Sequence, residues 1–113
     1  MPFSASRQGK LLRIFLGDSD QWEGKPLFQA LVEAARAQGL AGATVLHGVM
    51  GFGVHSRMHT ASILRLSTDL PVIVEIVDLP ERIDAFLPTV DAMVPEGLVT
   101  IEAAEVLRYR ARS

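Results

Sequence analysis

The residues best suited to chemistry lie in one stretch of the chain, between residues 47 and 65. Three glycines, Gly48, Gly51 and Gly53, occur within six residues of it. Glycine lets backbone N–H groups approach an anion closely, and concave groups of such amides bind phosphate or carboxylate. The spacing matches neither the dinucleotide-binding fingerprint nor a Walker A motif. The segment therefore predicts either an anion-binding loop or a flexible turn.

Two arginines, Arg57 and Arg65, follow these glycines along the chain. A guanidinium group can bind phosphate or carboxylate through two parallel hydrogen bonds. We therefore treat both arginines, together with the three glycines, as candidate ligand-binding residues. Surface solubilisation is the alternative role for each of them.

All three histidines, His47, His55 and His59, fall within thirteen residues. Histidine is the commonest metal ligand, but a structural zinc site usually needs four nitrogen or sulfur ligands. A metal site here would therefore need an oligomer in which several chains contribute histidines. Metal binding by such an oligomer is our second hypothesis. The hydroxyls of Ser56, Thr60 and Ser62 share this stretch but show no catalytic motif. We therefore expect that the protein is not an enzyme. A small hydrolase or isomerase is the last of the three function hypotheses.

An acidic group surrounds Trp22 and consists of Asp18, Ser19, Asp20 and Glu23. Carboxylates are favourable near a helix N-terminus, which gives these residues a structural role. Trp22 could alternatively offer a stacking surface to a base or a partner.

Regular elements must position these residues, and their order is strand–helix–strand, a loop, then strand–helix–strand. The four strands of this order are predicted over residues 10–17, 43–49, 72–77 and 98–102, the last extending towards 106. A loop is predicted over 48–62, and a short strand over 63–67 belongs to the hairpin arm that this loop forms. The order predicts a ferredoxin-like α+β βαββαβ sandwich, an antiparallel sheet with two helices on one face.

Helical periodicity and capping residues mark the two predicted helices. The second is predicted to carry an apolar stripe made of Ile83, Phe86, Leu87, Val90, Met93 and Val94. The first opens at Pro26 and has Gly39 at the C′ position. The second has Asp78 as N-cap, with Glu81 spaced to complete a capping box. Pro88 lies inside the second helix and should kink it.

The sheet face away from the helices must be exposed or must meet a partner. On it we place Leu11, Arg13 and Phe15 of the first strand beside Ile73, Glu75 and Val77 of a later one. The other face of the first strand, by the same alternation, carries Leu12, Ile14 and Leu16. An exposed Arg–Glu pair is one interpretation. The apolar neighbours favour the other, an interface between subunits.

Composition narrows the class of protein. With 113 residues, 49% hydrophobic residues and no cysteine, the chain should form one domain over residues 1–113, with flexible tails at 1–9 and 108–113 and no disulfides. A net charge of −2 with interspersed signs argues against nucleic-acid binding. The N-terminal residues lack the apolar core of a signal peptide, so we expect a cytoplasmic protein.

Three strings, KLLRIFLGDSDQWEGKPLFQALVEAARAQGLAGATVLHGVMGFG, ILRLSTDLPVIVEIVD and AFLPTVDAMVPEGLVTIEAAEV, resemble domain-of-unknown-function family 190 (DUF190). That family is grouped with the nitrogen-regulatory PII-like signalling proteins. The resemblance covers residues 11–106. It implies a homotrimer, a loop equivalent to the PII effector loop and a small ligand, often a nucleotide such as an adenine nucleotide, in clefts between subunits. It also implies a regulated partner, such as a membrane transporter or a fluoride channel; the ligand and any cofactor stay unknown.

Two features depart from classical PII proteins. The only tyrosine, Tyr109, lies in the C-terminal tail, so a loop tyrosine is absent as a modification site. Only residues 94–97 separate the second helix from the last strand, too few for the phosphate-gripping loop of PII. Under the metal hypothesis, the protein would be a metal-binding trimer similar in architecture to the CutA-type divalent-cation tolerance proteins.

Overall fold

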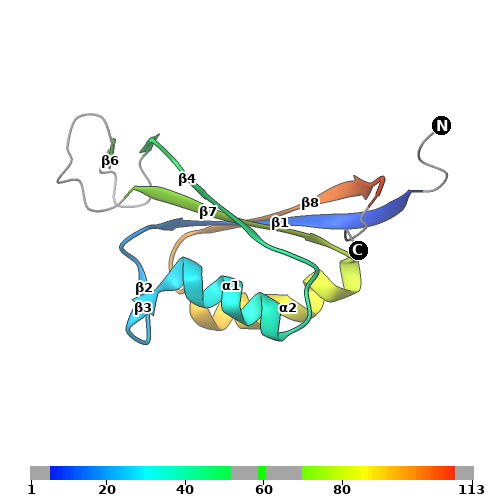
Figure 1. The fold of residues 1–113 in the computed structure, drawn as a ribbon, viewed down its shortest axis with the longest axis horizontal. Helices are drawn as coiled ribbons and strands as arrows, with labels where there is room; N and C mark the ends of the chain where they lie inside the picture. Colours follow the sequence, from blue (N-terminus) through cyan, green and yellow to red (C-terminus); the bar gives the residue numbers. More distant parts are fainter. Residues whose placement is uncertain (1–5, 52–58, 61–69, 109–113) are drawn as a thin grey trace, which may run out of the picture.

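The computed structural model describes residues 6–51, 59–60 and 70–108. Four strands form an antiparallel sheet, and two helices cover one of its faces (Figure 1). The sheet order is β4 (Thr44–His47), β7 (Pro71–Asp78), β1 (Arg7–Gly17) and β8 (Leu98–Val106). This arrangement confirms the predicted ferredoxin-like α+β fold.

The core forms between the sheet and the helices because alternate strand residues point to opposite faces. Leu12, Ile14 and Leu16 of β1 are buried on the helical side. They share that side with Val72, Val74 and Ile76 of β7. The period-two pattern predicted for the first strand is therefore confirmed.

Helix α1 (Leu27–Ala37) buries Leu27, Leu31 and Ala35. Pro26 is the N-cap rather than the first helical residue. Gly39 has a φ of 83° and occupies the predicted C′ position. Its N–H donates to the Arg36 carbonyl at 3.1 Å, and the Leu40 N–H donates to the Ala35 carbonyl at 3.0 Å, which closes the helix in a Schellman motif.

Helix α2 (Pro80–Met93) buries Ile83, Phe86, Val90 and Met93, which confirms its predicted apolar stripe. It runs through Pro88. The predicted capping box is wrong, because Leu79 is the N-cap and no side chain caps the helix. Asp78 is the last residue of β7 instead, and its carboxylate accepts hydrogen bonds from the Leu79 N–H at 2.7 Å and the Ala41 N–H at 2.9 Å.

Several element boundaries differ from those predicted. Residues 7–9, assigned to a flexible tail, belong to β1 and pair with β8, since Arg7 lies opposite Val106. β4 is shorter than the predicted strand and ends at His47. A short ladder joins β5 (Met50–Gly51) to β6 (His59–Thr60) inside the predicted loop. The strand predicted over 63–67 lies outside the described residues, and so do residues 109–113 of the predicted C-terminal tail.

The acidic segment also contains structure that its sequence did not indicate. β2 (Gln21–Trp22) and β3 (Lys25–Pro26) form a small hairpin before α1. Glu23 and Gly24 have φ values of 48° and 86° at its tip. Two successive positive φ values are typical of the tight turns that join paired strands.

Neither helix of the described residues is long and apolar enough to cross a membrane.

Candidate functional site

The root of the predicted ligand loop packs against Pro71, the first residue of β7. The Gly48 N–H donates to the Pro71 carbonyl at 2.7 Å. A Cβ atom at Gly48 would lie 2.6 Å from Pro71 Cγ, and one at Gly51 would lie 3.1 Å from the same atom. Both glycines therefore allow close approach to a proline ring, a role that the sequence interpretation did not include.

This geometry changes the expected anion site. The Gly48 N–H is already bonded to the protein, so it is not free to bind an anion. Gly51 is in β5, opposite His59 of β6. Gly53, Arg57 and Arg65 lie outside the described residues, and their roles stay predictions.

Of the three candidate metal ligands, His47 is the one whose side-chain contact the structure describes. The His47 ring lies edge-on to the Phe28 ring of α1, with 5.6 Å between the ring centroids. In the described residues no three His, Asp or Glu side chains form a group that could hold a metal ion. His55 is outside those residues, so a site that includes it stays a hypothesis.

The acidic segment is tied into the sheet by its own carboxylates. Asp18 exchanges two hydrogen bonds with Leu70, immediately before β7. The Asp20 carboxylate accepts a hydrogen bond from the Gly17 N–H at 3.0 Å. Trp22 is partly buried against the core, which favours a packing role over an exposed stacking surface.

The sheet face opposite the helices, which we call the open face, carries alternating apolar and polar rows. Cross-strand pairing places Leu46, Ile73, Phe15 and Leu98 in one row that crosses all four strands. Leu46 and Leu98 are 44% and 56% exposed. In the single chain this row therefore leaves large apolar side chains in contact with solvent.

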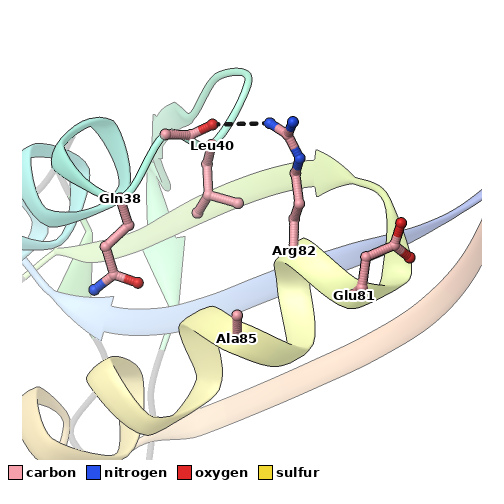
Figure 2. A pocket seen from close by; sticks show the side chains of 6 residues that line it. Gln38, Leu40, Glu81, Arg82 and Ala85 are labelled. Atoms are coloured by element: carbon pink, nitrogen blue, oxygen red, sulfur yellow. Dashed lines mark hydrogen bonds between the residues drawn. The ribbon is translucent and has the colours of Figure 1, made fainter.

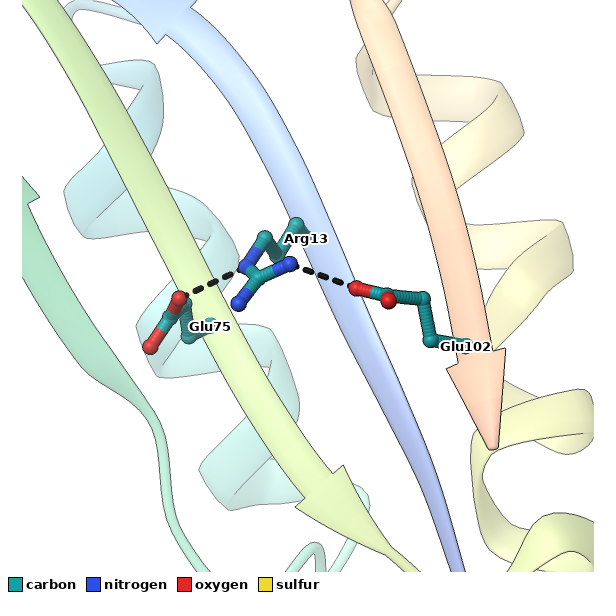
Figure 3. A network of polar contacts seen from close by, with 3 residues as sticks. All are labelled: Arg13, Glu75 and Glu102. Carbon is teal, nitrogen blue, oxygen red and sulfur yellow. Dashed lines mark hydrogen bonds and ion pairs between the residues drawn. The ribbon is translucent and has the colours of Figure 1, made fainter. Parts of the chain in front are cut away.

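Arg13 lies at the centre of the open face and joins three strands (Figure 3). Its Nε donates to Glu75 Oε2 at 2.8 Å, and its Nη1 donates to Glu102 Oε1 at 2.6 Å. The hydrogen bond to Glu75, aided by the charge of both carboxylates, raises the pKa of Arg13 above its already high ordinary value. The Arg13–Glu75 pair was one of the two interpretations of this face from the sequence, whereas Glu102 was missed. The alternation of residues along the last strand, combined with the order of strands in the sheet, could have indicated Glu102.

A shallow pocket of ≈ 330 Å³ lies between the C-terminus of α1 and the first turns of α2 (Figure 2). It is lined by Gln38, Gly39, Leu40, Glu81, Arg82 and Ala85. Arg82 Nη1 donates to the Gly39 carbonyl at 3.0 Å, and Gln38 Nε2 donates to Thr89 Oγ1 at 2.6 Å. These polar groups connect the two helices, so we assign the pocket a structural role.

The contact with Pro71 gives a first prediction. Gly48→Ala should lower the free energy of unfolding by about 1–3 kcal/mol, because its methyl group overlaps a proline ring that cannot rotate away. Gly42→Ala is the matched control, since its added Cβ would point into open space. Urea denaturation measures both variants. Equal stability of the two would show that residue 48 does not need glycine for packing.

The fold places the chain among the ferredoxin-like α+β sandwiches. The solved structures that resemble this chain include CPII, a nitrogen regulatory PII-like protein from Thiomonas intermedia K12. Its complex with ADP, AMP and bicarbonate matches with a TM-score of 0.63 and 18% sequence identity, over 92% of each chain. Its complex with ADP and bicarbonate matches with a TM-score of 0.61. At this identity the comparison shows the fold.

Sequence comparison then identifies the family. The model of DUF190, described as "Uncharacterized ACR", matches residues 9–106. A UPF0166 protein of Aquifex aeolicus is 40% identical over 98 residues, which are 87% of this chain and 92% of the relative. A UPF0166 protein of Methanocaldococcus jannaschii is 34% identical over 102 residues, 89% of this chain and 94% of the relative. The chain belongs to the DUF190 family, as its sequence resemblance indicated.

Proposed function

We propose that this protein is a PII-like regulatory subunit that binds a small anionic ligand, such as an adenine nucleotide, in clefts between the subunits of a homotrimer. The observation that carries the proposal is the similarity of fold to CPII over 92% of the chain, because CPII is described in complex with ADP, AMP and bicarbonate. The family membership and the exposed apolar row of the open face support it. Its role is regulatory rather than catalytic.

The open face supports the subunit interface of this proposal. A closed trimer that packs through this face removes the exposed leucines from water, and such burial is the main driving force of association. Arg13 would enter the interface already bonded to two carboxylates. Buried charges need such partners, because an unpaired charge in an interface is strongly destabilising.

The ligand site combines the glycine segment with the two arginines. Gly51 and Gly53 supply backbone N–H groups, and Arg57 and Arg65 supply charge-assisted hydrogen bonds to phosphate. Gly48 shapes the root of the loop through its contact with Pro71. Ligand binding orders the loop over 48–62, which then alters contact with a cytoplasmic face of a transporter or channel, a fluoride channel being one candidate.

Titration calorimetry with ADP and AMP tests the ligand site. Arg57→Ala should weaken nucleotide binding by about 1.5–3 kcal/mol, the range for a hydrogen bond to a charged group. Stability should change by less than about 0.5 kcal/mol, as is usual for surface substitutions. Arg36→Ala, which removes an exposed arginine of α1, is the matched control and should bind as the wild type does.

The same titrations distinguish the metal hypothesis. With zinc as the probe, His55→Ala and His59→Ala should abolish binding if the histidines hold a metal, and Arg57→Ala should have little effect. If Arg57→Ala binds nucleotide as the wild type does, the result would contradict the proposed role of Arg57 in phosphate binding. Failure of the wild type to bind either nucleotide would contradict the proposed ligand class.

A further inference from the structure

The centre of the open face carries more negative than positive charge. Glu75 of β7 lies directly opposite Arg13 of β1, and Glu102 of β8 lies two residues further along, opposite Leu11. Both carboxylates bond to the same guanidinium group, at 2.8 and 2.6 Å (Figure 3). One positive charge therefore serves two negative charges. This group, which we call the Arg13 triad, leaves each chain with an excess of one negative charge at this point.

Among the described residues of the open face, no further charged side chain adjoins the Arg13 triad. Its neighbours across the sheet are threonines, since Thr44 is opposite Glu75 and Thr100 is opposite Arg13. The other charged residue that alternation places on this face is Arg7, six residues from Arg13 along β1. Six residues of extended strand span about 20 Å. Within one chain, the excess charge is therefore balanced by solvent.

Assembly through the open face would remove that solvent. The Glu102 side chain is 58% exposed, and the Glu75 side chain is 28% exposed. The surface that covers them in a homotrimer is the open face of another copy. That copy brings the same excess of negative charge to the contact, so its own triad cannot supply the missing positive charge.

We infer that the Arg13 triad is a proton-binding site of the assembled protein: each triad takes up one proton from solvent when open faces pack together, so assembly strengthens as the pH falls. Burial without a compensating charge favours the neutral form of a carboxyl group. A glutamate in water is ionised above about pH 4.3, so near neutral pH the proton is taken up on assembly. The triad is then neutral, with one guanidinium, one carboxylate and one carboxylic acid. The inference rests on the proposed function, because it concerns the subunit interface of the proposed trimer.

Sedimentation equilibrium at fixed ionic strength, between about pH 5.5 and 8 and thus above the ordinary titration range of glutamate, tests this inference. The slope of the logarithm of the association constant, expressed per chain, against pH counts the protons that each chain takes up. The triad of the wild type should strengthen association about tenfold per chain for each unit by which the pH falls. Glu102→Gln removes the excess charge and should lower the slope by one proton per chain. Arg13→Met leaves two uncompensated carboxylates and should raise the slope by one.

Glu105→Gln is the matched control, because Glu105 is a glutamate of the same strand that alternation places on the helical side of the sheet. It should keep the wild-type slope. A slope that is equal in the wild type and in Glu102→Gln would overturn the inference and leave the trimer intact. Loss of assembly in Arg7→Gln would overturn it as well, because the neighbouring copy would then supply the balancing charge.

The remaining outcomes separate the proton from other ions and the inference from the proposed function. Assembly that requires added magnesium chloride or potassium chloride and is independent of pH would overturn the inference in favour of a bound cation. A wild type that is monomeric at every pH would overturn both the inference and the trimer. A wild type that binds neither ADP nor AMP but shows the expected slopes would support the inference, while the proposed ligand class fails.

Discussion

Leu98→Glu is expected to convert the assembled protein into single chains at micromolar concentration. Leu98 is 56% exposed in the isolated chain and belongs to the apolar row of the open face. A glutamate there should cost the single chain little. In a closed trimer it would place an unpaired carboxylate in each interface, and an uncompensated buried charge costs about 3–5 kcal/mol. Sedimentation equilibrium measures the change in mass.

Ala92→Glu is the control for this experiment, because Ala92 is exposed on α2, on the opposite side of the sheet. It adds the same charge and should leave the mass unchanged. A wild-type chain that is monomeric at micromolar concentration would contradict the trimer itself. A Leu98→Glu variant that assembles as the wild type does would show that another surface joins the subunits.

Phe86→Ala should produce one of the largest losses of stability among alanine substitutions in the described core. Phe86 is 0% exposed and is among the largest fully buried side chains. Replacing a buried phenylalanine with alanine costs about 3–5 kcal/mol, because apolar contacts are lost and a cavity remains. Urea denaturation at one fixed protein concentration measures this loss, since assembly makes apparent stability depend on concentration.

Phe86→Leu keeps most of the buried apolar volume and should lose much less stability, typically below about 1.5 kcal/mol. Similar losses for leucine and alanine would indicate that the aromatic shape, rather than buried volume, determines the packing at this position. A small loss in both variants would show that residue 86 is not part of the core.

Local patterns predicted those parts of the fold that depend on one segment at a time. The alternation of Leu12, Ile14 and Leu16 predicted a strand with one buried face, and it is confirmed. The helical spacing of Ile83, Phe86, Val90 and Met93 predicted the buried stripe of α2. Such patterns are readable because the helix and strand periods are properties of the backbone itself. The Asp78 capping box failed because β7 extends to Asp78, whose carboxylate bonds to the loop after α1 as well as to Leu79.

The candidate site also has features that the sequence indicated and features that only the tertiary structure shows. Residue types alone indicated that a loop rich in glycine, arginine and histidine could bind an anion, and that Arg13 could pair with Glu75. Only the tertiary structure revealed that Gly48 and Gly51 pack on Pro71, that Asp18 bonds to Leu70 and that Glu102 joins Arg13. These contacts link residues from 20 to 89 positions apart, and such partners are chosen by strand order and register. The sequence by itself thus determined the two helices, the four strands of the main sheet and the two faces of β1, whereas packing of distant strands decided which side chains meet.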